Sequence, residues 1–182
     1  MLNHYGYGLE ELNCQLTSSP FSGLNGNIHA ESVMVDSILL DTLNFSIRTD
    51  SVRTSYQAQI RNNKKNPQYT FNALIDGVIH DKGTVFGTRL YDENGELGVR
   101  LGLQATMEQN GIMLRTYGND PVLGYRKFHV NDDNYVFLGP RNRVSADLVM
   151  RADDGTGVQV YTNDDNEDAQ QDITFSLHHF DL

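Results

Sequence analysis

The stretch LGVRLGLQATM, residues 97–107, alternates without a break between apolar residues and polar residues or glycines. A period of two residues predicts a β-strand with one apolar face and one polar face. Asn94-Gly95 precedes this stretch and Asn110-Gly111 follows it. The Asn-Gly dipeptide supplies the two positive-φ residues that a tight hairpin turn needs. We therefore predict an antiparallel meander of three long strands, over about residues 84–93, 96–108 and 112–118.

The two turns also predict which residues stand opposite each other. A two-residue turn at Asn94-Gly95 pairs Leu90 with Val99 on the apolar face. It also pairs Arg89 with Arg100 on the polar face, where two like charges disfavour the pairing but a solvated face tolerates it. The same rule at Asn110-Gly111 gives the pairs Leu114–Met107 and Thr116–Ala105.

Alternation of the same kind continues along the chain, which predicts about twelve strands separated by turns. Ser32–Leu43 is the stretch in which a helix competes, because Val35, Ile38 and Leu39 fit helical spacing. Its Ser, Thr and Asp residues are poor inside a helix, and the alternation that begins at Leu43 favours a strand.

The pattern predicts an all-β fold, an elongated, curled antiparallel sheet built from long consecutive hairpins, with residues 1–182 as a single domain. An ordinary β-sandwich is the alternative, because periodicity alone does not separate an open sheet from a sandwich core.

The composition narrows the range of partners. The formal net charge is −10, which argues against binding of nucleic acid or of an anionic membrane surface. The single Cys14 cannot form an internal disulfide, and we identify no signal peptide and no apolar run long enough to span a membrane as a helix. These features fit a cytoplasmic protein, and they fit equally a segment excised from a longer, repetitive exported protein.

The sequence contains no pattern that predicts catalysis. None of its six histidines stands at zinc-ligand spacing with a cysteine or another histidine. The acidic clusters 131–134 and 163–168 lack the ligand order of an EF-hand loop, and we interpret them as solvated turns. No Gly-x-Ser-x-Gly elbow occurs. We expect no enzymatic activity, no metal and no cofactor; a hydrolase whose carboxylates the fold brings together is a less favoured class.

Five short segments of the chain carry a resemblance to a known family: Asp41–Leu43, Asn72–Gly77, Leu123–Arg126, Asn131–Phe137 and Ala152–Gly157. They resemble segments of TamB-like proteins (translocation and assembly module) of the Bacteroidota type, which belong to the AsmA-like superfamily. The resemblance extends from about Gly23 to the C-terminus, and none of its segments is a catalytic signature.

The resemblance implies a non-enzymatic segment of a very long protein that an N-terminal helix anchors in the inner membrane and that extends across the periplasm. The repeated strands of such proteins build a taco-shaped β-groove lined with apolar side chains. This groove is implicated in conducting phospholipid toward the outer membrane and in outer-membrane protein assembly. The implied partners are phospholipid acyl chains and, through the parent protein, an outer-membrane assembly protein of the Omp85 type. The isolated segment is expected to self-associate through its open sheet edges.

The residues that we expect to bind lipid occupy the apolar positions of the alternating stretches. They are Phe71, Ala73, Ile75, Val99, Leu101, Leu103, Ala105, Met107, Leu114, Val144, Ala146, Leu148, Met150, Phe175 and Leu177. The alternative function is that of a secreted β-sandwich that binds glycan or protein ligands. A glycan module exposes aromatic side chains on one face, whereas the alternation here is mostly aliphatic.

Overall fold

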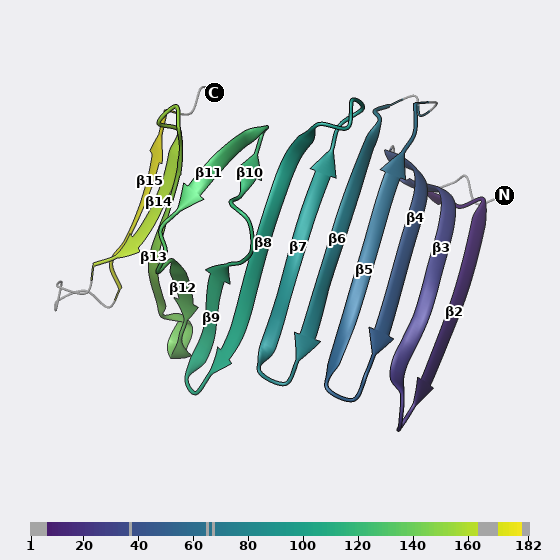
Figure 1. The fold of residues 1–182 in the computed structure, drawn as a ribbon, viewed down its shortest axis with the longest axis horizontal. Helices are drawn as coiled ribbons and strands as arrows, with labels where there is room; N and C mark the ends of the chain where they lie inside the picture. Colours follow the sequence, from purple (N-terminus) through teal and green to yellow (C-terminus); the bar gives the residue numbers. More distant parts are fainter. Residues whose placement is uncertain (1–6, 37, 65, 67, 164–170, 180–182) are drawn as a thin grey trace.

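The computed structural model describes residues 7–36, 38–64, 66, 68–163 and 171–179. Its strands form one sheet of 15 strands in which every pairing is antiparallel (Figure 1). Within the described residues, the helical content is limited to the short 3₁₀ turn η1 (Pro140–Asn142). The predicted all-β fold of consecutive hairpins is confirmed.

The N-terminal part of the sheet follows chain order from β3 to β8, and both β1 and β2 pair with β3. The first hairpin shows how the turns end the strands: Ser19 closes β2 immediately before Pro20, and the Ser19 hydroxyl accepts the N–H of Ser22 at 2.9 Å. The strands are β1 (Tyr7–Gly8), β2 (Glu11–Ser19), β3 (Gly23–Val35), β4 (Ile38–Thr49), β5 (Arg53–Asn62), β6 (Phe71–His80), β7 (Gly83–Tyr91) and β8 (Leu97–Glu108).

The C-terminal part of the sheet branches. β8 pairs with both β9 and β10, while β13 pairs with both β12 and β11, so that two paths of strands connect β8 to β13 (Figure 1). The turn between β11 and β12 is fixed by asparagine side chains: Asn134 Oδ1 accepts the N–H of Thr116 at 2.8 Å, and Asn131 Oδ1 accepts that of Val149 at 2.9 Å. The strands are β9 (Gly111–Thr116), β10 (Val122–Leu123), β11 (Arg126–Val130), β12 (Tyr135–Leu138), β13 (Val144–Ala152), β14 (Gly157–Thr162) and β15 (Ile173–His178).

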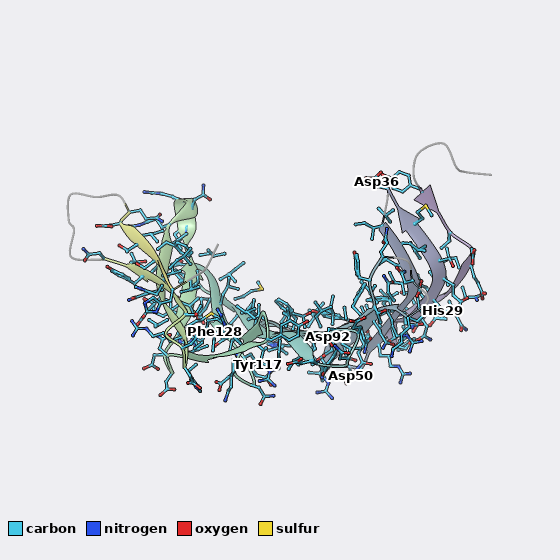
Figure 2. All side chains as sticks on the ribbon, turned by 90° about the horizontal axis from the view of Figure 1, so that it is seen from above. His29, Asp36, Asp50, Asp92, Tyr117 and Phe128 are labelled. Carbon is cyan, nitrogen blue, oxygen red and sulfur yellow. The ribbon has the colours of Figure 1, made fainter. Side chains whose placement is uncertain are left out.

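The sheet bends into a U when it is viewed along its strands (Figure 2). The N-terminal strands form one arm of the U and the C-terminal strands form the other. Phe128 lies on the side of the sheet that faces the space between the arms, whereas Tyr117 lies on the outer side (Figure 2). The predicted curled sheet is therefore present, and its two faces are a concave and a convex surface.

The predicted register is confirmed at the first turn and wrong at the second. Leu90 stands opposite Val99 as predicted. The loop is longer than the predicted two residues, and a bulge lies between the pairs Leu90–Val99 and Tyr91–Leu97. At the second turn Met107 stands opposite Ile112 rather than Leu114. The reason is Gly111, which belongs to β9 and not to the turn.

A Cβ atom on Gly111 would collide with the carbonyl oxygen of Leu138. The glycine at this position therefore permits the close approach of β12, whereas the prediction had assigned it to the turn. The resulting shift is of two residues, so that the faces of β9 remain as predicted.

The choice between helix and strand over Ser32–Leu43 is also settled. Ser32–Leu43 contains the end of β3 and the start of β4, so the strand interpretation is confirmed over its described residues. A loop of three residues, 153–155, follows β13. The N–H of Ala152 donates to the carbonyl oxygen of Thr156 at 2.8 Å across this loop, and Met150 stands opposite Val158.

The sheet has one layer and therefore little core. Its buried apolar side chains are Ala30, Val122, Phe128, Ala146 and Met150. The accessible surface is 12892 Å², whereas a compact monomer of 20.5 kDa exposes about 8,900 Å². This excess of about 4,000 Å² is what an open sheet with no opposing layer exposes. The described residues thus form an open sheet and not the β-sandwich that was the alternative.

Candidate functional site

The cross-strand register decides which of the predicted lipid-binding residues share a face. In β8, Leu101 stands opposite Thr88 of β7, and Leu103 stands opposite Thr116 of β9. Directly opposed residues of an antiparallel pair point to the same side of the sheet. When these pairs are followed from strand to strand, every predicted residue from Phe71 to Leu177 lies on one face, together with Phe128. We call it the apolar face, and it is the concave one.

Sequence reasoning missed further residues of the apolar face. Many of them stand in stretches whose alternation was visible, but only the register assigns them to this face rather than to the opposite one. They are Leu12, Leu16, Ile28, Ala30, Leu43, Phe45, Ile47, Ala58, Ile60, Ile112, Phe128, Val130, Val136, Leu138, Val158, Val160 and Ile173.

The apolar face is covered to very different degrees along the sheet. Where β11 and β13 meet, Phe128 is 2% exposed and Met150 is 7% exposed. Toward the strand ends and the C-terminal edge, Met107 is 65% exposed and Phe175 is 62% exposed. No helix and no second sheet of the described chain lies over these side chains. An uncovered apolar surface of this extent is typical of a binding surface.

The middle of the apolar face carries no charge. The central positions of β4 to β8, such as Phe45, Ala58, Ile75, Thr88 and Leu101, are apolar or neutral. This surface attracts other apolar groups through the hydrophobic effect and dispersion, neither of which requires a fixed orientation of the ligand.

The convex face, which we call the polar face, resolves the conflict between Arg89 and Arg100. The two arginines do stand opposite each other. Arg89 forms an ion pair with Asp76 of β6, and Arg100 donates from Nε and Nη2 to the carbonyl oxygen of Asp120 at 3.1 and 2.9 Å. Each guanidinium therefore has its own acceptor, and the like charges are drawn to opposite sides.

Aspartates hold the loops that connect the strands. The N–H groups of Val52 and Arg53 donate to Asp50 at 2.8 and 2.9 Å and hold the pKa of that carboxyl below its usual 3.8. In the same way the N–H of Glu96 lowers the pKa of Asp92. The N–H of Thr156 lowers that of Asp154. These bonds favour the charged carboxylate.

The melting temperature should therefore fall on acidification. Because the folded-state pKa of these aspartates is below the unfolded value of 3.8, their contribution is present above that value and is lost as the pH falls through the folded pKa. Calorimetry from about pH 6 to about pH 2.5 would measure this loss. The triple variant Asp50→Asn, Asp92→Asn, Asp154→Asn keeps an acceptor at each loop without the charge, so its melting temperature should depend less on pH. An equally steep dependence would contradict the assignment.

Neither a metal-binding cluster nor a membrane-spanning helix is found in the described residues. Among them, no group of three or more His, Cys, Asp or Glu side chains is placed to hold a metal ion. In the same part of the chain no helix is long and apolar enough to span a bilayer. Searches with protein-family models, among curated proteins and among solved structures found no match to this chain.

Proposed function

We propose that this chain binds the acyl chains of lipids along its apolar face. The observation that carries the proposal is the continuity of this face: it extends from β2 to β15 across one sheet, on the concave side, with no layer of the described chain over it. A concave apolar surface surrounds a flexible chain on more than one side. This geometry suits a ligand that has length but few polar groups.

The free energy of such binding comes from the area that is removed from water. Burial is worth about 25 cal/mol per Å² of apolar surface and about 0.8 kcal/mol per methylene group. At this value about 5 to 19 buried methylenes offset the cost of about 4–15 kcal/mol for the lost translational and rotational freedom, a number that one or two acyl chains supply. Because the contacts are apolar and unspecific in direction, an acyl chain can slide along the face from one group of side chains to the next.

The finer proposal follows the resemblance to TamB-like proteins. In it the chain is a non-enzymatic segment of a longer, inner-membrane-anchored protein of the periplasm, which conducts phospholipid toward the outer membrane. An assembly protein of the Omp85 type is then a partner of the parent protein. The sheet supports this proposal through its open edges: β2 pairs only with β3, and β15 only with β14, among the described strands. Each outer edge can accept a further strand, from a neighbouring repeat or from a second copy.

The substitution Leu101→Asp tests the proposal. Leu101 lies in the middle of β8 on the apolar face and is partly exposed. On a face that admits water, the carboxylate remains hydrated, so that we expect a loss of stability on the order of 1–2 kcal/mol and a folded protein. The charge should nevertheless remove most crosslinking to a photoactivatable phospholipid, because an acyl chain cannot solvate it.

Gln104→Asp is the matched control. Gln104 lies in the same strand but on the polar face, where it stands opposite Val85 and Arg115. The same charge should leave lipid crosslinking unchanged at this position. The proposal would be wrong if the wild-type chain captured no lipid, or if the two variants lost crosslinking equally.

A further inference from the structure

The polar face contains a hollow of about 680 Å³ that the lipid proposal does not use. It lies over β4 to β8 and is lined by three arginines, Arg48, Arg89 and Arg100, and by one acidic residue, Asp76. In a chain whose formal net charge is −10, this local excess of positive charge is unusual. It attracts an anion and not a cation.

The three arginines differ in how far the protein itself satisfies them. Arg89 is paired with Asp76, and Arg100 donates to the carbonyl oxygen of Asp120. The Arg48 guanidinium forms no ion pair and no side-chain hydrogen bond with any residue that the structure describes. A guanidinium carries five N–H donors, so that donors remain for a ligand even on the two partnered arginines.

The floor of the hollow is formed by two opposed glycines, Gly87 and Gly102. Gly102 is required by the fold, because a Cβ atom there would collide with the carbonyl oxygen of Tyr117. Gly87 is not: its Cβ would meet only the carboxylate of Asp76, at 3.8 and 3.9 Å, which is ordinary contact. A glycine inside a strand costs stability, and one that internal packing does not require leaves the backbone open to the close approach of an external group.

We propose that this hollow binds an oxyanion, a phosphate or carboxylate group carried by a small polar ligand. The group would lie above Gly87 and accept hydrogen bonds from Arg48 and from the free donors of Arg89 and Arg100. Guanidinium groups bind both kinds of oxyanion through paired N–H donors. The polar side chains of Ser55 and Gln57 at the wall of the hollow can hold the hydroxyl groups of such a ligand.

The test is a titration of the whole chain, with the backbone amide signals of Gly87 and Gly102 followed by nuclear magnetic resonance. Inorganic phosphate, glycerol 3-phosphate and glucuronate are the probes, and they separate a phosphate ligand from a carboxylate ligand. We expect saturable shifts with at least one probe, weakening as sodium chloride is added. Arg48→Gln should weaken the affinity about tenfold, because it removes a charge-assisted hydrogen bond. Arg61→Gln, on the same face but outside the hollow, should leave the affinity unchanged.

A second variant separates binding from folding. Gly87→Ala should leave the melting temperature unchanged or raise it, while it weakens the affinity severalfold by raising the floor of the hollow. Absence of saturable binding by all three probes would overturn the proposal. So would an equal loss of affinity in Arg48→Gln and Arg61→Gln, which would show that the probes respond only to the general charge of the face.

Discussion

Phe128→Ala is expected to lower the free energy of unfolding by about 3–5 kcal/mol. Phe128 is 2% exposed and lies in β11, where the sheet turns into its C-terminal arm. Its N–H donates to the carbonyl oxygen of Pro121 at 2.8 Å, and Met150, on the same face of the adjacent strand β13, is also buried. Truncation would leave a cavity at the place where this thin sheet has most of its few buried side chains. Because domains are stable by only about 5–15 kcal/mol, this single change should remove a large share of the total.

Urea denaturation of the wild-type and variant chains measures the effect. Phe175→Ala is the matched control, since it makes the same chemical change on the same face at a side chain that is 62% exposed. There we expect a loss below about 1 kcal/mol. Equal losses at the two positions would show that another copy or another layer covers the apolar face of the folded chain in solution.

The strands and their faces could be predicted because both depend on a local period. Residues 97–107 alternate over their whole length, and this alone fixes which side chains of β8 share a side. The pairing of Leu90 with Val99 required only the position of one turn. Every residue that was predicted to contact lipid lies on one face, because the register between neighbouring strands keeps the apolar sides together.

The features that could not be predicted are those that depend on distant parts of the chain. Shifting β9 by two residues keeps every side chain on its own face, so the hydrophobic pattern does not separate the true register from the predicted one. The strand β10, with two residues, contains too few positions for a period to be recognised. The ion pair between Arg89 and Asp76 connects adjacent strands and becomes visible only when β6 and β7 are aligned.

Hydrogen bonds in which an asparagine side chain takes the place of a backbone group could not be predicted from the sequence pattern either. The bonds of Asn62 are the clearest case. Asn62 is 1% exposed at the end of β5. Its Oδ1 accepts the N–H of Asp41 at 3.0 Å, and its Nδ2 donates to the carbonyl oxygen of Leu39 at 3.1 Å. The side chain thus continues the hydrogen bonding of β4 beyond the point where the backbone pairing of β5 ends. In the sequence Asn62 begins the polar run NNKKN, which is typical of a turn.

Asn62→Ala should therefore destabilise the fold by about 1–3 kcal/mol, because the N–H of Asp41 loses its partner and an unsatisfied buried group costs about that much. The carbonyl oxygen of Leu39 keeps a bond from Asn66 at 3.1 Å, which limits the loss on that side. Asn72→Ala is the control. Within the described residues the Asn72 side chain makes one hydrogen bond, which its Oδ1 accepts from Gln59 Nε2 at 2.8 Å. The freed Gln59 can turn to water, so this variant should lose less than about 1 kcal/mol.

Amide hydrogen exchange at Asp41 should speed up in Asn62→Ala and remain slow in Asn72→Ala, since only the first substitution removes the acceptor of that N–H. Unchanged exchange at Asp41 in both variants would show that Asn62 does not carry the hydrogen bonding of β4.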